Sequence, residues 1–202
     1  MESDVRSKRL TILLVIAGIR GRPHICKNTT MKISIYIASS ANGFISNSRN
    51  VPDWLSNEYG EGFYSICQRA KAVIMGKTTY GILAPEYLPL KEEGTTVVLT
   101  TDRHAKSQNP TVVFTQDDPV KIVEMLIGKG HTETVIIGGA QAMSVFVNAG
   151  LVNDIYFVIE PALFGRGLPL LKGVARDIKL RLIDVKKLND NTVQLHYELQ
   201  HA

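Results

Sequence analysis

The sequence predicts an α/β fold in which a mixed, mostly parallel sheet carries helices on both faces. Three observations support this class. Short apolar runs typical of buried strands alternate with amphipathic stretches typical of helices between residues 32 and 159. Within that region, the stretch 135–143 joins an apolar run to a helical stripe through two glycines. The chain closes with two alternating strands, 179–186 and 192–199, which indicate an antiparallel hairpin.

The predicted strands share an apolar or an alternating pattern. They cover residues 32–39, 44–45, 72–75, 96–99, 111–114, 135–137, 155–159, 179–186 and 192–199. Three helices also have clear signals. The first is expected to begin at Asp53, as its N-cap, although Gly60 and Gly62 lower its helix propensity. The other two end at glycines, and they cover residues 117–128 and 140–149.

The net charge of the chain is concentrated in its first 30 residues. The full sequence has 23 Lys and Arg against 19 Asp and Glu. Residues 1–30 hold six of the basic and two of the acidic residues, which leaves 17 of each in residues 31–202. Because the basic and acidic residues of 31–202 are equal in number, the sequence indicates no basic face there, and we expect no nucleic-acid partner. Cys26 and Cys67 form no disulfide framework and no metal spacing, which predicts a cytoplasmic protein.

Residues 1–30 are predicted to be an N-terminal extension that is poorly ordered or precedes the native start. Met31 opens a strand pattern at once, which makes it a candidate start. The apolar run 10–19 is too short to span a bilayer, so we expect no membrane partner. A signal or membrane-surface segment, and an added strand or helix, are the alternatives. The folded domain is predicted to cover residues 31–202.

The junction at Gly138-Gly139 is suited to binding an anion. A strand that enters a helix through two glycines exposes the unpaired N–H groups of the first helical turn. The missing side chains also let a phosphate approach the backbone closely. The alternative interpretation is that the two glycines only make a tight turn.

Two further strands end in groups that suit a phosphate. Met75 is followed by Gly76-Lys77-Thr78-Thr79, and Leu99 is followed by Thr100-Thr101. Because parallel strands present their carboxyl ends at one edge of a sheet, the three junctions are expected to meet. A dinucleotide with an extra 2′-phosphate would use all three, so we predict an NADPH cradle. Lys71 stands where a P-loop needs glycine, and no Gly-x-Gly-x-x-Gly opens the first strand–helix turn.

The three junctions resemble the cofactor motifs of the dihydrofolate reductase-like fold. They read Met-Gly-Lys-Thr-Thr-Tyr at 75–80, Val-Leu-Thr-Thr at 98–101 and Ile-Gly-Gly-Ala at 137–140. The stretch from Leu151 through Glu160-Pro161 and Gly165-Arg166-Gly167 to Leu171 is more specific. It resembles the reductase (C-terminal) domain of the riboflavin-biosynthesis deaminase-reductase family. Residues 39–45 resemble that family's opening segment, with Asn42 where Asp is usual.

This resemblance covers about residues 31–200. It implies a three-layer dihydrofolate reductase-like fold, NADPH as the cofactor and a homodimer. It also implies that the Gly138–Gly139 peptide bond is cis, as it often is in the family.

The resemblance assigns cofactor contacts position by position. Ala38 and Ile45 would line the nicotinamide pocket. Lys77, where the family often has Arg, would hold the pyrophosphate and the 2′-phosphate side together with Thr78 and Thr79. The other implied contacts go to the adenosine ribose phosphate and the diphosphate, from Gly76, Thr100, Thr101, Gly138, Gly139, Ala140, Gln141 and Met143.

The substrate side departs from the dihydrofolate reductases. Val158 stands at the position of their pterin-network threonine, and Gly94 stands at that of the arginine that anchors the folate tail. Without a bidentate partner for a tail carboxylate, dihydrofolate is a poor fit. The resemblance therefore implies a pyrimidine- or pterin-type substrate, most like 5-amino-6-(ribosylamino)uracil phosphate of the riboflavin pathway. Dihydrofolate reduction is the alternative activity.

The chemical hypothesis is hydride transfer from C4 of NADPH to a C=N or carbonyl carbon. Asp53 or Glu58 would orient the substrate or relay a proton. Trp54, Tyr156 and Glu160 would bind the substrate. Each of these residues also has a purely structural interpretation, as a helix cap, a solvated helix residue, a core residue or the end of a strand.

Other reaction classes lack their motifs. The histidines have no metal-ligand spacing, His196 falls on the polar face of its strand, and no nucleophile elbow is present, so we expect no metal site. The alternative to a reductase is a catalytically idle nucleotide-binding or oligomerisation module. The expected partners are a small-molecule substrate and, from the resemblance alone, a second copy of the chain.

Overall fold

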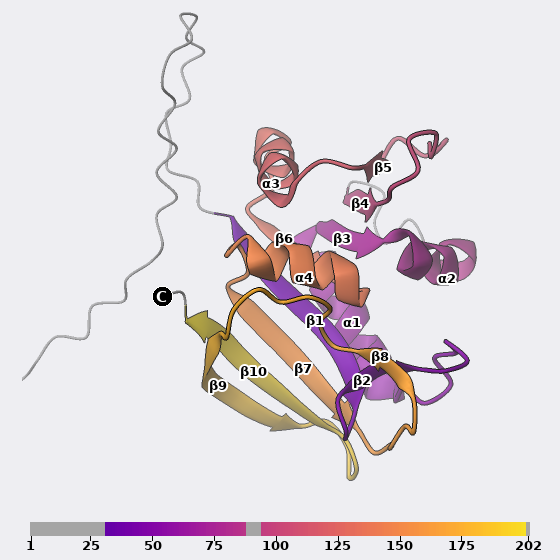
Figure 1. The fold of residues 1–202 in the computed structure, drawn as a ribbon, viewed down its shortest axis with the longest axis vertical. Coiled ribbons are helices and arrows are strands. Elements are labelled where there is room, and N and C mark those ends of the chain that lie inside the picture. Colours follow the sequence, from indigo (N-terminus) through magenta and orange to yellow (C-terminus); the bar gives the residue numbers. More distant parts are fainter. Residues whose placement is uncertain (1–30, 88–93, 201–202) are drawn as a thin grey trace, which may run out of the picture. The chain divides into compact units, whose positions relative to one another are not determined.

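The central sheet has eight strands in the part of the chain that the computed structural model describes, residues 31–87 and 94–200. Their order is β5-β4-β3-β6-β1-β7-β10-β9. The strands from β5 to β7 run parallel, whereas β10 is antiparallel to both β7 and β9. Their bounds are β1 (Lys32–Ser40), β3 (Ala72–Gly76), β4 (Thr95–Leu99), β5 (Val112–Thr115), β6 (Glu133–Ile136), β7 (Asp154–Glu160), β9 (Lys179–Lys187) and β10 (Val193–Gln200). The predicted mostly parallel sheet with a C-terminal antiparallel hairpin is confirmed (Figure 1). The expectations for residues 1–30 fall outside the described residues and stay predictions.

Two short strands form a separate antiparallel pair, β2 (Phe44–Asn47) and β8 (Gly167–Pro169). β2 follows β1 through the Asn42-Gly43 turn, where Gly43 has a φ of +86°. A Cβ at Gly167 would lie 2.2 Å from the carbonyl oxygen of Ser46, so the pairing requires glycine there. The pair brings two distant segments to the carboxyl end of β1 (Figure 1).

Helices cover both faces of the sheet. α1 (Asn57–Ala70) and α2 (Lys77–Tyr87) pack on one face, and α3 (Pro119–Gly128) and α4 (Ala140–Asn148) pack on the other. Figure 1 shows α4 in front of the sheet and α1 behind it. The predicted three-layer arrangement is therefore confirmed.

The start of α1 differs from the prediction. Asp53 is not its N-cap; Ser56 is, and the Ser56 hydroxyl accepts a hydrogen bond from Tyr59 N at 3.2 Å. Asp53 lies in the preceding turn, where its carboxylate pairs with Arg49 at 3.0 Å. The helix begins later because Ser56 has the extended backbone and the side-chain geometry that a cap needs. In the same way, Asp118 caps α3.

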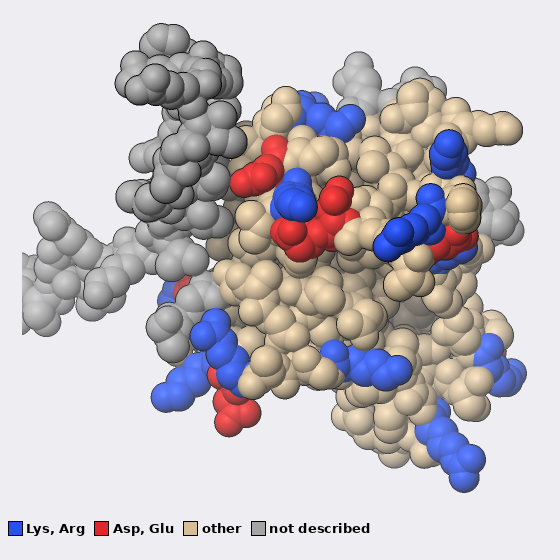
Figure 2. Space-filling model, turned by 45° about the horizontal axis from the view of Figure 1, so that its top comes forward, with Lys and Arg blue, Asp and Glu red and all other residues tan. Residues whose placement is uncertain are grey.

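The charged surface is mixed in sign. On the face shown in Figure 2, Lys and Arg side chains are interspersed with Asp and Glu, as the balanced composition of residues 31–202 predicts. Exposed ion pairs such as Lys187–Asp190 at 2.8 Å contribute to this pattern. Such pairs stabilise a fold by roughly 0.2–1 kcal/mol each. None of the described helices is long and apolar enough to cross a bilayer.

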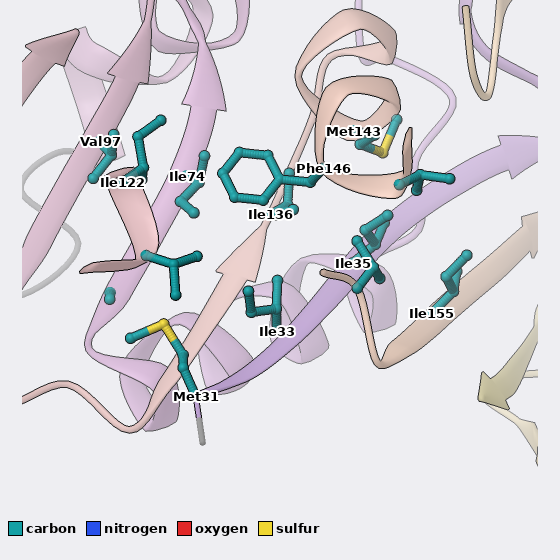
Figure 3. Packing of buried hydrophobic residues seen from close by; sticks show 14 of the residues in the cluster. Met31, Ile33, Ile35, Ile74, Val97, Ile122, Ile136, Met143, Phe146 and Ile155 are labelled. Carbon is teal, nitrogen blue, oxygen red and sulfur yellow. The ribbon is translucent and has the colours of Figure 1, made fainter. Parts of the chain in front are cut away.

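Two apolar clusters fill the spaces between the layers. On one face, the Phe146 ring of α4 points onto the sheet toward Ile74 and Ile136, and all three residues are fully buried (Figure 3). On the other face, Tyr36 of β1 stacks on Tyr59 of α1 with ring centroids 5.2 Å apart. Burying one such side chain contributes about 1.5–3 kcal/mol. These contacts hold the strands whose ends carry the predicted junctions.

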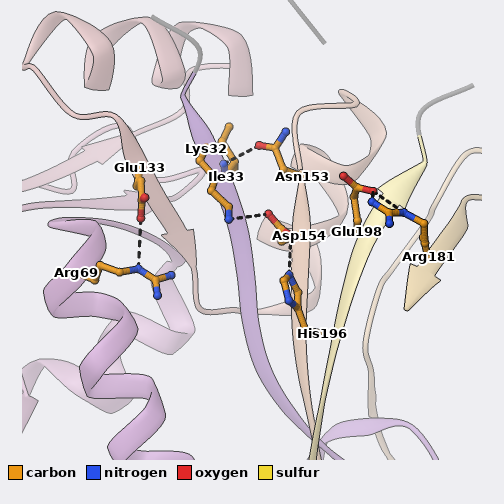
Figure 4. Close-up of polar contacts among 9 residues, drawn as sticks. All are labelled: Lys32, Ile33, Arg69, Glu133, Asn153, Asp154, Arg181, His196 and Glu198. Carbon is orange, nitrogen blue, oxygen red and sulfur yellow. Dashed lines mark hydrogen bonds and ion pairs between the residues drawn. The ribbon is translucent and has the colours of Figure 1, made fainter. Parts of the chain in front are cut away.

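A polar network joins β1, β7 and β10. Asp154 of β7 lies between Lys32 Nζ, at 3.3 Å, and His196 Nε2, at 2.6 Å (Figure 4). The His196 ring also stacks on Tyr156 with centroids 4.3 Å apart. The polar face of β10 thus bonds the hairpin to the parallel part of the sheet.

Candidate functional site

The three predicted junctions meet at one edge of the sheet, at the carboxyl ends of β3, β4 and β6. Gly76 N donates to the carbonyl oxygen of Gly138 at 2.9 Å, which joins the first junction to the third. Lys77 Nζ lies 2.9 Å from Asp102 Oδ2, which joins the first junction to the loop after β4. Segments far apart in the sequence therefore form one continuous surface.

A cleft of about 1790 Å³ opens over this surface. A pocket for one drug-sized ligand has a volume of roughly 300–1,000 Å³. The cleft therefore has room for more than one such molecule. Its walls come from β1, β2, the four helices and the loops that follow β3, β4, β5 and β6.

Nearly all of the predicted cofactor residues line this cleft. They are Ala38, Ile45, Gly76, Lys77, Thr78, Thr79, Thr100, Thr101, Gly138, Gly139, Ala140 and Gln141. Met143 does not line it. The Met143 side chain is fully buried in the core beneath α4, because the helical period turns position 143 toward the sheet.

The start of α4 fits a phosphate group. Its N-cap is Gly139, which makes no side-chain hydrogen bond to the helix, so the amides of the first turn have no side-chain cap. Ala140 and Gln141 of that turn line the cleft. Unpaired amides and the positive end of the helix dipole attract an anion.

The glycines of the cradle leave the backbone open. A Cβ at Gly138 would lie 3.5 Å from Thr79 Oγ1, and a Cβ at Gly76 would lie 3.7 Å from Gly139 N, so added side chains would occupy the space between the junctions. Gly138 has a φ of +119°, and its peptide bond to Gly139 is cis, as the resemblance implies. The cradle therefore suits close approach of a diphosphate.

The other end of the cleft is lined mainly by aromatic and aliphatic side chains. Trp54, a predicted substrate residue, lies there with Tyr59, Phe63 and Tyr64 from α1. The Trp54 ring is held edge-on to Phe164 with centroids 5.0 Å apart. Flat apolar walls of this kind suit a planar heterocycle.

Asp53 and Glu58, the predicted catalytic residues, do not line the cleft. Asp53 is paired with Arg49 outside it. Glu58 Oε2 accepts a hydrogen bond from Asn189 Nδ2 at 2.8 Å, and this bond holds the pKa of the Glu58 carboxyl below its usual value. Both carboxylates thus have partners in surface contacts.

Tyr156 and Glu160, predicted to bind the substrate, do not line the cleft either. Tyr156 stacks on His196 in the polar network. Glu160 is 1% exposed and accepts hydrogen bonds from Ser56 N at 3.0 Å, Ser56 Oγ at 2.7 Å and Thr192 Oγ1 at 2.9 Å. Its carboxylate therefore ties the start of α1 and the start of β10 to the end of β7.

Several lining residues were not predicted from the sequence. Tyr59 and Phe63 belong to the apolar stripe of α1, and a stripe does not reveal which members reach a cleft. Lys172 also lines the cleft, but it lies one residue beyond the stretch that resembles the family most specifically, and no signal in the sequence marked it. In the described part of the chain, no three His, Cys, Asp or Glu side chains gather closely enough to hold a metal ion.

Comparison with known proteins identified a matching family model and similar proteins. Residues 31–194 match the family model described as the RibD C-terminal domain. Two proteins of Bacillus subtilis (strain 168) are similar along most of their length. The uncharacterised protein YwjB is 28% identical over 172 residues, which cover 82% of this chain and 97% of YwjB. The uncharacterised protein YyaP is 23% identical over 177 residues, which cover 82% of this chain and 94% of YyaP.

Solved structures share the fold. A "putative riboflavin biosynthesis protein" from Shewanella sp. PV-4 superposes with a TM-score of 0.73 at 22% identity, over 85% of this chain and all of that one. The diaminohydroxyphosphoribosylaminopyrimidine deaminase/5-amino-6-(5-phosphoribosylamino)uracil reductase of Thermotoga maritima gives a TM-score of 0.69 at 16% identity. That match covers 85% of this chain but 57% of the longer Thermotoga protein.

Proposed function

Because this chain belongs to the RibD C-terminal domain family, we propose that it is an NADPH-dependent reductase. It transfers a hydride to a C=N or carbonyl carbon of a pyrimidine- or pterin-type small molecule. The activity most similar to it is reduction of 5-amino-6-(ribosylamino)uracil phosphate in the riboflavin pathway. The observation that carries the proposal is the meeting of three phosphate-suited junctions in one cleft that has room for a second molecule.

In this proposal the cofactor supplies the hydride, and the chain supplies position and charge. Gly138, Gly139 and the first-turn amides of α4 hold the diphosphate. Lys77, with the threonines of the first two junctions, holds the ribose phosphates. Ala38 and Ile45 line the same cleft, and in this proposal they bound the nicotinamide. Met143 contributes only by supporting α4 from the core.

The substrate is proposed to lie at the aromatic end, against Trp54. A chemical role for Asp53 would require its carboxylate to leave Arg49, and one for Glu58 would require it to leave Asn189. Glu160 has its oxygens engaged by three donors, and we propose that it supports the substrate wall by fixing Ser56. Dihydrofolate stays the weaker alternative, since Val158 is fully buried and apolar where a pterin would need a hydroxyl.

Cofactor binding tests the proposal directly. Titrating the full chain with NADPH and with NADH, while nicotinamide fluorescence is followed, should show binding and a preference for NADPH. Lys77→Ala should weaken NADPH by about tenfold and NADH much less, as expected for a lost charge-assisted hydrogen bond to a phosphate. Lys187→Ala is the matched control, because Lys187 has an equivalent exposed ion pair outside the cleft. If neither nucleotide changed the nicotinamide fluorescence on titration, the proposed reductase function would be rejected.

A second candidate function is a nucleotide-binding module without turnover. It is favoured by one observation, that both predicted catalytic carboxylates lie outside the cleft lining. Following NADPH oxidation with a ribosylamino-pyrimidine phosphate and with dihydrofolate separates the two functions. Binding of NADPH without oxidation by either substrate class would favour the idle module.

We also propose a cytoplasmic location and a homodimer as the working form. The location is supported by Cys67, which is buried as a free thiol, as suits a reducing compartment. The dimer is supported by apolar side chains that β9 exposes.

A further inference from the structure

The cation of the cradle is already paired with a carboxylate of this chain. Lys77 Nζ lies 2.9 Å from Asp102 Oδ2, and the two side chains are 55% and 43% exposed. Asp102 is fixed in its loop by two more hydrogen bonds, from its own N–H to Thr100 Oγ1 at 3.1 Å and from His104 N to its Oδ1 at 3.0 Å. The bond from Lys77 also lowers the pKa of the Asp102 carboxyl, which is charged at neutral pH. A ligand that approaches Lys77 therefore meets a positioned negative charge beside it.

Asp102 itself is not among the residues that line the cleft, but two carboxylates near its loop do line the cleft. Asp117 and Asp118 line it, next to Gln116, whose Nε2 donates to the carbonyl oxygen of Thr101 at 3.1 Å. Asp117 accepts a hydrogen bond from Thr115, and Asp118 caps α3 and faces Lys121 at 3.9 Å. Besides Asp102 next to Lys77, the lining of the cleft therefore includes two carboxylates.

We propose that Asp102 sets how strongly this cleft prefers NADPH over NADH, by competing with the 2′-phosphate for Lys77. This inference rests on the proposed cofactor function. A phosphate monoester carries roughly −1.5 to −2 charges at neutral pH, so it must displace Asp102 from Lys77 or lie beside a like charge. Either route weakens binding. NADH has a hydroxyl in that place, and a carboxylate accepts a hydrogen bond from a hydroxyl without like-charge repulsion.

Asp102→Asn tests the competition in the full chain, with nicotinamide fluorescence as the readout. The substitution keeps the size of the side chain and removes its charge. NADPH should bind about fivefold more tightly, the scale of an interaction between exposed charges. NADH should bind equally well or more weakly. Asp190→Asn is the matched control, because it removes the same charge from an exposed Lys–Asp pair outside the cleft, and it should change neither affinity.

The double variant Lys77→Ala/Asp102→Asn tests whether Asp102 acts through Lys77. If Asp102 acts by competing for Lys77, Asp102→Asn should tighten NADPH less in the Lys77→Ala background than in the wild-type chain. A tightening as large as in the wild-type chain would mean direct repulsion between Asp102 and the phosphate, and it would overturn the competition. If both nucleotides bind but Asp102→Asn leaves their affinity ratio unchanged, the inference is overturned and the cofactor function stands. An equal change in the ratio of NADPH to NADH affinity with Asp190→Asn would also overturn the inference. Failure of the wild-type chain to bind either nucleotide would overturn both proposals.

Discussion

The fold favours the neutral form of the His131 imidazole over the protonated form. It follows α3, and its Nε2 lies 2.9 Å from Thr95 Oγ1 at the start of β4. Burial lowers the pKa of His131 below its ordinary value of 6.5, and the charges of Lys129 and Lys71 lower it further. The folded protein therefore binds this proton less readily than the unfolded chain does.

This difference predicts a pH dependence of stability. The contribution of His131 is fully present above the ordinary pKa and is lost as the pH falls through the lowered pKa of the folded state. Between about pH 7.5 and pH 5.5, the unfolding free energy of the wild-type chain should therefore fall more than that of His131→Asn. Urea unfolding at a series of pH values measures both slopes. Equal slopes for the two chains would contradict the prediction.

Two glycines of α1 have opposite roles within one element. A Cβ at Gly60 would meet open space. A Cβ at Gly62 would lie 2.2 Å from the hydroxyl of Tyr36, which donates to the carbonyl oxygen of Tyr59 at 3.1 Å. Gly60 is therefore a helix residue without a packing reason, whereas Gly62 is needed for the close approach of α1 to β1.

The matched substitutions Gly60→Ala and Gly62→Ala should change stability in opposite directions. Gly60→Ala should raise the unfolding free energy by about 0.5–1 kcal/mol, because alanine favours helix and restricts the unfolded chain. Gly62→Ala should lower it by about 1–3 kcal/mol, since Tyr36 must move and lose its hydrogen bond. Denaturant unfolding of both variants measures the two values. If Gly62→Ala raised the free energy of unfolding, the contact between position 62 and Tyr36 would not limit stability, and the prediction would be wrong.

In the whole molecule, the features that could be predicted from the sequence are the buried strands, which short apolar runs reveal, and the edge of the sheet where parallel strands end together. Runs such as 72–75 and 135–137 are apolar on both faces, so their strands were readable. The rule that parallel strands share a carboxyl edge was enough to bring Lys77 and Gly138 into one cleft.

Contacts between distant residues were not predictable in this way. Glu160 is buried because Ser56 and Thr192 supply its donors, and those partners are 104 and 32 positions away. The N-cap of α1 was assigned to Asp53 but is Ser56. Both residues have side chains that can cap a helix, so the sequence alone did not show which of them the helix would follow. The start of α4 was predicted correctly at residue 140, but the resemblance assigned Met143 to the cofactor together with its neighbours, whereas the helical period turns its side chain into the core.

The edge strand β9 exposes apolar side chains on one face. Leu180, Leu182 and Val185 of β9 pair with alternate residues of β10 and therefore share one face of the hairpin. Their side chains are 44%, 50% and 53% exposed. An apolar strand at a sheet edge is an aggregation hazard unless something covers it. A twofold contact would cover this face on both copies at once, which is why we propose it as the homodimer interface.

Leu182→Glu should break this dimer, because it places a charge in the centre of the apolar face. Leu163→Glu is the matched control, since Leu163 is 76% exposed in the loop after β7 and lies outside the hairpin. Light scattering should give the wild-type chain and Leu163→Glu a mass of twice 22.3 kDa, and Leu182→Glu the mass of one chain. A monomeric wild-type chain would refute the dimer. A dimeric Leu182→Glu variant would instead move the interface to another surface, because a buried, unpaired carboxylate at this position would weaken any contact that covers β9.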